Sequence, residues 1–450
     1  MMNRFTPGLV ALALAAGCAA PHSGSPPYVP PSLEAAAPVP PRSGPLRLED
    51  CVRIALARSR TVRMADRRIL IARDRSSESL ASILPKLGVT GRYEARNNDP
   101  GATLGGAPVI TGERRVGSAS ASLLVPIYDF GVSWNRWDAS RLQEDRVTLD
   151  AAGARLRVTL DVTLAWFRVL EARKIREVVE ESLQAIDRQL EVARDARAQG
   201  LVAANDVLAA EVQQADRRQQ LLMAENNEKL AGAVLNRFLG ERLEAPVEIA
   251  EAEDPEPWRG SYEAALRAAL DNRPDLASLR KGIEAAQAMW RSTRDGFFPR
   301  IYAYADYRWI SDDFVLNHDW LDGGLLVEVP LFDGGATLAG MRRAEKEIEQ
   351  AVDGNAESVD EAALSVMKAY LDLQSAAARI PVAKKAVELA EENLRVMRDL
   401  YAQAQVSSAE VLTEEDRLAR ARSGYFQARY ECHEANARLV YETGGTLPGK

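Results

Sequence analysis

Few side chains in this 450-residue sequence have the types and spacing that chemistry requires. The three histidines, His22, His318 and His433, have no cysteine or histidine neighbours at the spacing of a metal site. The sequence also contains no glycine-rich phosphate loop and no activated-nucleophile motif. We therefore expect no enzyme, no cofactor and no metal site.

The first cysteine follows a candidate export signal. Met1–Gly17 has one positive charge and then a short apolar stretch, which is typical of a secretory signal peptide. Residues 14–18, Leu-Ala-Ala-Gly-Cys, resemble a bacterial lipobox, so we expect lipidation at Cys18. Ordinary cleavage beside an incidental cysteine is the alternative. Ala19, in place of an aspartate, favours the outer membrane, and the proline-rich residues 18–45 would form an extended, lipid-anchored tether.

Two further cysteines, Cys51 and Cys432, lie far apart in the sequence. An exported protein meets an oxidising compartment, so the two could form a disulfide. Two separate buried thiols are the alternative, because the sequence does not fix the distance between them.

The composition favours long exposed helices over a compact globular core. Charged residues make up 27% of the chain and aromatic residues only 6%, with arginine and glutamate interspersed. The net charge is −8 and no concentrated basic patch occurs, so nucleic acid is not an expected partner.

The sequence contains two similar halves. Similar segments occur in the same order in residues 46–250 and 251–443, which leaves a short C-terminal tail at 444–450. The matching pairs are Leu48–Leu56 with Tyr262–Leu270, Leu84–Leu87 with Phe298–Ile301, Val125–Gly131 with Val329–Gly335, and Val202–Leu208 with Val406–Leu412. Ordered matches of this kind predict an internal twofold repeat.

Each copy contains a stretch in which apolar and polar residues alternate, at about 86–127 and 299–331. Alternation predicts a pair of strands in each copy, with Asn97–Gly112 as a hairpin loop. A strand of about ten residues with one apolar face suits a membrane barrel, but four strands cannot close around a pore. Several protomers would each have to supply four strands. A four-stranded sheet packed on a soluble core is the alternative.

Long helices follow each pair of strands. Apolar residues recur every three or four positions through 133–199 and 337–403, which predicts helices of about 100 Å with coiled-coil packing. Returning helices are expected at 205–239 and 409–441, each after a short turn.

These features together resemble the outer-membrane factor (TolC-like) family. The resemblance covers about residues 46–443 and rests on the proline-containing helix ends, the Val-Pro-(Ile/Leu)-(Tyr/Phe)-Asp-x-Gly strand exits and the Gly-Leu-Val-Ala-x-x-Asp-Val-Leu turn. It implies a mainly α fold with membrane β: a homotrimeric α-barrel of long coiled helices continuous with a 12-stranded β-barrel. It also implies a passive duct in outer-membrane lipid, whose periplasmic tip docks a periplasmic adaptor protein and an inner-membrane pump.

The resemblance assigns roles to residues near the two turns. It implies that Asp206, beside Asn205, closes the tip by contacting Tyr401 on a long helix. The family has a second contact, from an arginine in the second turn, but Val406 stands there in this sequence. A helix-capping carboxylate is the alternative role for Asp206, and a packed seam residue is the alternative role for Tyr401.

An acidic constriction is the other expected feature of the tip. The resemblance places Glu410 where the family has an inward-facing aspartate, whereas Thr413 occupies the second acidic position. Glu414 lies one helical turn after Glu410 and could partly replace the missing charge. Two glutamates on a solvated outer surface are the alternative.

A protein of another class remains to be considered, a periplasmic coiled-coil adaptor or scaffold lipoprotein. Adaptors usually have one helical hairpin between β modules. This sequence predicts two hairpins and barrel-like strands, which favours the duct.

Cys18→Ser should abolish lipidation, because Cys18 is the cysteine at the signal junction. We expect palmitate labelling of the wild type and none of the variant. Labelling that persists in the variant would refute the lipid anchor.

Overall fold

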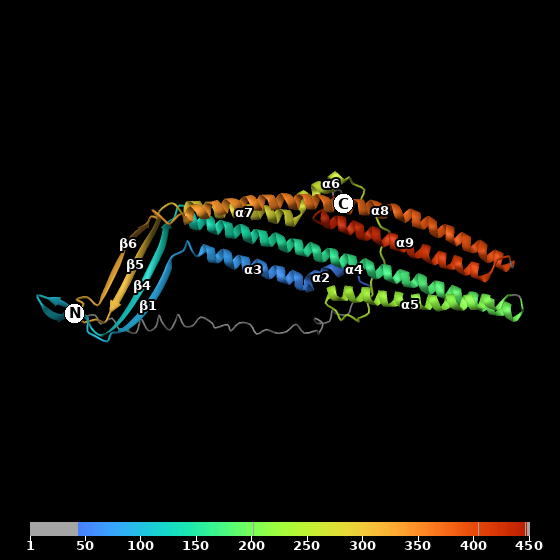
Figure 1. Cartoon of the computed structure of the whole chain (residues 1–450), viewed down its shortest axis with the longest axis horizontal. Coiled ribbons are helices and arrows are strands. Elements are labelled where there is room, and N and C mark those ends of the chain that lie inside the picture. The colour runs from blue at the N-terminus through green and yellow to red at the C-terminus, as the bar shows by residue number, and fades with distance from the viewer. Residues whose placement is uncertain (1–43, 201, 404, 446, 448–450) are drawn as a thin grey trace. The chain divides into compact units, whose positions relative to one another are not determined.

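The computed structural model describes residues 44–445 and 447, apart from positions 201 and 404. The expected signal peptide, Cys18 and nearly all of the tether therefore lie outside the described residues. Within them the chain is mainly helical, with one four-stranded sheet and a small hairpin (Figure 1). Among the helices of this part, none has an apolar stretch long enough to cross a bilayer.

Two successions of elements follow one another along the chain. The first consists of α2 (Leu48–Arg58), α3 (Arg60–Leu80), β1 (Lys86–Ala95), β2 (Gly101–Leu104), β3 (Ala107–Ile110), β4 (Arg115–Tyr128), α4 (Val132–Ala198) and α5 (Ala204–Leu239). The second consists of α6 (Tyr262–Asn272), α7 (Pro274–Asp295), β5 (Arg300–Ile310), β6 (Asp319–Glu328), α8 (Ala336–Ala402) and α9 (Ser408–Glu442). The hairpin β2–β3 forms inside the segment expected to be a loop.

The long helices begin at a turn that the sequence encodes. Asp129 accepts hydrogen bonds from the backbone N–H groups of Gly131 (3.1 Å) and Ser133 (2.7 Å), which stabilises the start of α4. Asp333 binds the corresponding groups of Gly335 and Thr337 before α8. The aspartate and glycine of the strand-exit motif thus turn the chain from strand into helix.

The turn before α4 holds a side chain in a conformation that normally suits glycine. Phe130 has φ of 54°, and Gly334 has φ of 69° in the corresponding turn. The Phe130 ring stacks on Phe298, with centroids 5.2 Å apart, and this packing offsets the backbone strain.

The four-stranded sheet is antiparallel, with the order β1-β4-β5-β6. Its register places Val89, Ala121, Tyr307 and Leu321 in one row across all four strands. The adjacent row, on the opposite face, consists of Thr90, Ser120, Arg308 and Trp320. One face is therefore apolar and the other mainly polar. Leu87 on the apolar face is 75% exposed and Leu321 is 74% exposed.

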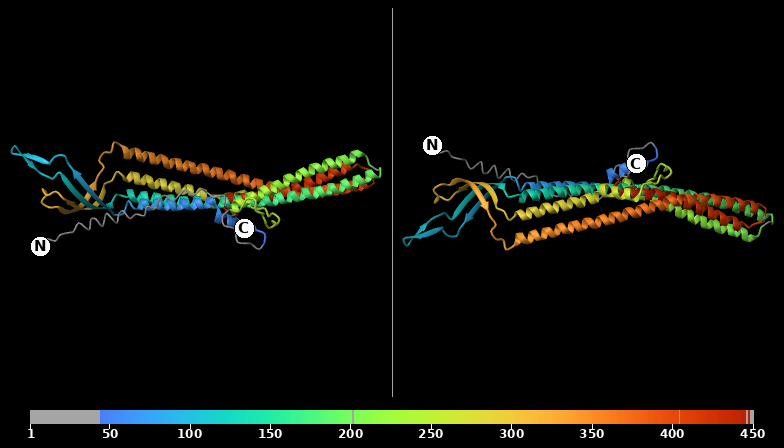
Figure 2. Two further views of the ribbon diagram at one scale, coloured as in Figure 1. Left: turned by 90° about the horizontal axis from the view of Figure 1, so that it is seen from below. Right: turned by 90° about the horizontal axis from the view of Figure 1, so that it is seen from above.

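The long helices pack in pairs. Helix α4 contacts α5, and α8 contacts α9, so each pair forms a hairpin (Figure 1). Helix α9 also lies against α4 and α5, which brings the two hairpins together (Figure 2). The sheet lies at one end of α4 and α8, and the turns of the two hairpins lie at the other end.

The possible disulfide between Cys51 and Cys432 is not formed in this structure. Cys432 is a free, buried thiol in a cluster with Ala265 and Leu373, whereas Cys51 is buried in another cluster with Val162 and Leu235. Because each sulfur belongs to a different part of the core, the structure favours two separate buried cysteines.

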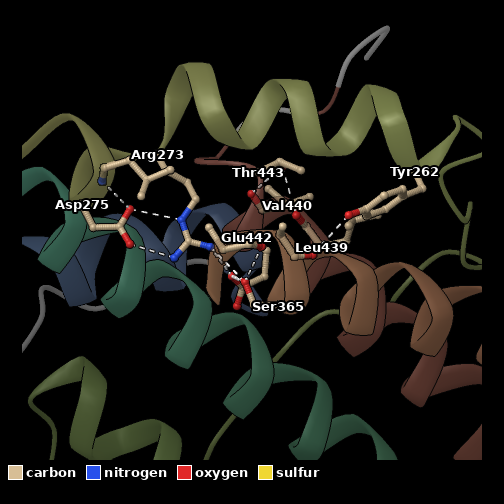
Figure 3. A network of polar contacts seen from close by, with 11 residues as sticks. Tyr262, Arg273, Asp275, Ser365, Leu439, Val440, Glu442 and Thr443 are labelled. Atoms are coloured by element: carbon tan, nitrogen blue, oxygen red, sulfur yellow. Dashed lines mark hydrogen bonds and ion pairs between the residues drawn. The ribbon is translucent and has the colours of Figure 1, made fainter. Parts of the chain in front are cut away.

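A polar network fixes the end of α9 (Figure 3). Arg273, between α6 and α7, donates hydrogen bonds to Glu442 (2.7 Å) and to Ser365 of α8 (3.1 Å). Its guanidinium also pairs with Asp275 at 2.7 Å. The start of the expected tail is packed as well: a Cβ on Gly444 would meet the backbone of Asn272 at 2.6 Å, and Leu447 is buried.

Replacement of Arg273 should loosen this junction. We expect Arg273→Ala to lower the free energy of unfolding of the helices by about 2–3 kcal/mol, because Glu442 and Ser365 lose a charged donor in a half-buried place. Thermal and denaturant unfolding followed by helical circular dichroism would measure the change. Arg267→Ala, on the exposed face of α6, is the control and should have little effect.

Candidate functional site

The two turns at the free ends of the hairpins carry most of the candidate site residues. The first turn joins α4 to α5 and contains Gly200, whose φ of 77° lies in the left-handed region that favours glycine. The second turn joins α8 to α9. Both turns lie at the same end of the helices (Figure 1).

Glu410 caps the second turn. Ser407 and Glu410 form a capping box: the Ser407 side chain accepts a hydrogen bond from the Glu410 backbone N–H. In return, the Glu410 carboxylate accepts a hydrogen bond from the Ser407 backbone N–H at 2.7 Å. Glu410 remains exposed. The carboxylate therefore stabilises the start of α9 and is also accessible at the tip.

Asp206 and Tyr401 are not paired in this protomer. Asp206 lies half-buried in the first turn of α5, next to exposed Asn205. Tyr401 packs against the α8–α9 seam, in a cluster that includes Leu394 and Val411. Its hydroxyl is buried and has no hydrogen-bond partner within the described residues. The seam packing of Tyr401 is thus formed, and the gating contact stays a prediction.

Glu414 is buried in the protomer. Its residue is only 6% exposed, and its carboxylate accepts hydrogen bonds from Asn393 of α8 and from Arg417 at 2.7 Å. A carboxylate buried between α8 and α9 and paired with a cation adds little charge to a constriction. In the protomer, Glu414 is thus buried while Glu410, one helical turn earlier, is exposed, and the acidic constriction stays a prediction.

Sequence reasoning missed the polar contacts that cross between the hairpins near the turns. Arg217 of α5 pairs with Asp416 of α9 at 2.7 Å, and Arg422 of α9 pairs with Glu181 of α4 at 3.1 Å. Arginines recur on every face of these helices, so no signal in the sequence distinguishes the arginine that is buried.

A second polar region lies between α4 and α9, farther from the turns. Burial, together with the nearby carboxylates of Glu434 and Glu431, raises the pKa of Glu171 to about 7, although Arg168 opposes the shift. Burial also raises the pKa of Glu434, which pairs with Arg168 and Arg438. Near neutral pH, Glu171 is thus partly protonated at the contact between the hairpins.

His433 in this region is not a proton carrier near neutral pH. Its ring stacks on Phe167 with centroids 4.5 Å apart, and burial beside Arg429 lowers its pKa to about 4. No group of three or more potential metal ligands occurs in the described part of the chain.

Comparison with known proteins gives the class of this fold. The family model described as "Outer membrane efflux protein" matches residues 51–241 and 265–445, most of the chain. The chain therefore belongs to the outer membrane efflux protein family.

Relatives and solved structures agree with that family. The alkaline protease secretion protein AprF of Pseudomonas aeruginosa is 29% identical over 236 residues, which cover 50% of this chain and 48% of AprF. The outer membrane protein TolC of Escherichia coli is 23% identical over 83% of this chain and 77% of TolC. The chain thus aligns with about half the length of AprF. A crystal structure of CusC has the same fold, with a TM-score of 0.79 and 19% identity over 94% of this chain and 99% of CusC.

The stability of the helices should depend on the protonation of Glu171. The folded protein keeps a proton on Glu171 up to about pH 7, whereas the unfolded chain releases it near pH 4.5. Raising the pH through this interval therefore destabilises the folded protein. We expect the melting temperature to fall from pH 5 to pH 8 in the wild type, and to fall less in Glu171→Gln.

The matched control is Glu191→Gln, which changes an exposed glutamate of the same helix. Its pH profile should follow the wild type. Identical profiles for the wild type and Glu171→Gln would contradict the raised pKa.

Proposed function

We propose that this chain is one protomer of a trimeric exit duct in the outer membrane, lipid-anchored through Cys18 and extending into the periplasm. The duct is passive and serves a tripartite efflux or secretion system, in which a periplasmic adaptor and an inner-membrane pump engage the tip. The family and the names of AprF and TolC support the outer-membrane location and the role in export.

The apolar face of the sheet carries this proposal. Its large side chains face solvent in the single protomer, and β1 and β6 are edge strands. An exposed apolar face and two unpaired edge strands both need partners. Lipid would cover the apolar face, and strands of neighbouring protomers would pair with the two edges. Three protomers would supply twelve strands, enough for a closed barrel with the polar face inside.

The helices show a similar need for partners. Helices α5 and α8 each expose large apolar side chains along one side, namely Leu208, Val212, Leu222 and Leu230 on α5 and Leu364, Leu371, Val382 and Leu389 on α8. In the proposed trimer these sides belong to contacts between protomers, and the long helices form an α-barrel. The two segments matched by the family model support an internal twofold repeat, and three protomers with two similar hairpins each would give six hairpins around the proposed axis.

At the tip, Asp206, Asn205 and Tyr401 form the proposed gate. The Tyr401 hydroxyl has no hydrogen-bond partner among the described residues, and in the proposed gate Asp206 would supply one. Glu410, exposed beside the second turn, lines the proposed entrance.

Charge on the two faces of β1 tests the duct. Val89→Arg places a charge on the apolar face and should reduce trimer formation severely, since a charge facing lipid costs about 2–4 kcal/mol near the bilayer centre. Thr90→Arg, on the opposite face of the same strand, should assemble normally. Mass measurement in detergent, heat-modifiable migration and conductance in planar bilayers provide the readouts.

A stable wild-type monomer with full strand content and no conductance would contradict the duct. That result would instead favour the coiled-coil adaptor or scaffold lipoprotein.

A further inference from the structure

A polar cavity lies between α3 and α4, which run side by side below the sheet (Figure 1). Its volume is about 310 Å³, at the lower limit of sites that bind small molecules. Its polar lining comes from Arg68 and Arg75 of α3 and from Ser140 and Gln143 of α4. None of the candidate site residues at the tip belongs to it.

The two arginines of this cavity lack partners within the protomer. Neither the Arg68 nor the Arg75 guanidinium forms an ion pair or a hydrogen bond with another described residue. Glu144 of α4, which follows Gln143 in the sequence, pairs with Arg73 at 3.3 Å instead. No aspartate or glutamate lines the cavity. The cavity therefore holds two positive charges without a carboxylate to balance them.

Helical spacing places the two charges on one surface. Arg68 and Arg75 are seven residues apart, so they lie on the same side of α3 and about 10 Å apart along its axis. Ile71 and Ala72, which lie between them on the helix, also line the cavity, and Val147 of α4 adds to this apolar part. A ligand in the cavity would thus meet a cation at each end and apolar side chains between them.

These donors suit a phosphate group. The guanidinium of arginine is planar and always charged, and it donates two parallel hydrogen bonds to an oxyanion. The Ser140 hydroxyl and the Gln143 amide have no side-chain hydrogen-bond partner among the described residues, so they offer donors for the remaining phosphate oxygens. The apolar part of the lining leaves room for an organic group attached to the phosphate.

We propose that the cavity between α3 and α4 binds the phosphate group of a ligand, which Arg68 and Arg75 hold from two sides. Ser140 and Gln143 complete the site. A soluble phosphate or a phospholipid headgroup can supply the same chemical group, and the two sources are separated by experiment.

The position of the cavity connects the lipid source with the proposed duct. Helix α3 ends at Leu80, and β1 begins at Lys86. Arg75 lies five residues before the end of α3, or about 8 Å along its axis. With the sheet in the outer membrane, Arg75 lies near the periplasmic headgroups. The lipid source therefore rests on the proposed duct, whereas binding of soluble phosphate does not.

Phosphorus NMR of the full-length protein in dodecyl maltoside, an uncharged detergent without phosphate, tests the site. Inorganic phosphate and dihexanoylphosphatidylglycerol are added separately as probes, and binding broadens the phosphorus signal of the probe. Arg68→Gln and Arg75→Gln should each weaken binding by about tenfold, because each removes a charge-assisted contact. Added salt should weaken binding to the wild type, since both arginines are exposed and their charges are screened.

The matched control is Arg67→Gln. Arg67 is also exposed and has no ion pair among the described residues, but it points about 100° away from Arg68 around α3 and does not line the cavity. This variant removes the same charge from the same helix and should bind both probes as the wild type does. Arg68→Lys keeps the charge without the planar fork and should bind with intermediate strength.

The outcomes separate the site from its source and from the duct. Equal binding by the wild type, Arg68→Gln and Arg75→Gln would overturn the site, as would an equal loss in Arg67→Gln or no binding by the wild type. Tighter binding of phosphatidylglycerol than of phosphate supports the site with a headgroup as its ligand, and the reverse supports it with a soluble one. If the arginine variants fail to assemble, Ser140→Ala decides: weaker binding supports the site and unchanged binding overturns it. A protein that binds phosphate through both arginines but never conducts would overturn the duct and leave the site standing.

Discussion

Within one protomer, the four-stranded sheet has two unpaired edges and an uncovered apolar face. Hydrogen bonds pair β4 and β5 on both sides, but β1 and β6 stand at the edges, and the apolar face that includes Val89 and Leu321 is open. A globular protein would cover such a face with its helices. Here the turns at Asp129 and Asp333 start α4 and α8 at the ends of strands, so the helices extend away from the sheet instead of packing across it.

The long helices consequently bury their apolar side chains in several separate clusters along their length. Within the α8–α9 hairpin the seam is apolar near the turn, with Ala390, Leu394 and Val411 in one cluster. Between the hairpins, apolar contacts alternate with polar ones: Ile186 packs with Leu412, while Arg217 meets Asp416 and Arg168 meets Glu434. Apolar seams hold each hairpin as a unit, and the polar positions make the contact between hairpins easier to break.

Much of this arrangement could be predicted from the sequence, because glycine and proline mark where the helices and strands begin and end. A glycine directly precedes each long helix, at Gly131 and Gly335, and few prolines or glycines lie within these helices. The helices expected at 133–199 and 337–403 therefore differ by one residue at each end from α4 and α8. Alternation of period two predicts which side chains share a face of the sheet. The small hairpin β2–β3 was missed, since Gly105 and Gly106 signal a turn but the short flanking residues do not signal strands.

The candidate site was less predictable, because helical spacing assigns a face but not the neighbour that covers it. Glu410 and Glu414 are one turn apart, yet one is exposed and the other is buried against Asn393. Cys51 and Cys432 are both apolar-core residues, and only the packing of α2 and α9 shows that they belong to different clusters.

The seam between the hairpins combines two kinds of charged contact. Near the turns, the guanidinium of Arg217 is buried against Asp416 and is always charged. The strength of this ion pair therefore depends on burial rather than on the protonation of Arg217. Farther along, burial and neighbouring carboxylates raise the pKa of Glu171 to about 7, so its charge depends on pH. Deprotonation of Glu171 adds repulsion with Glu434 across α4 and α9 and weakens the seam from the end opposite Arg217. Both contacts therefore involve the same helix, α9, at positions near its two ends.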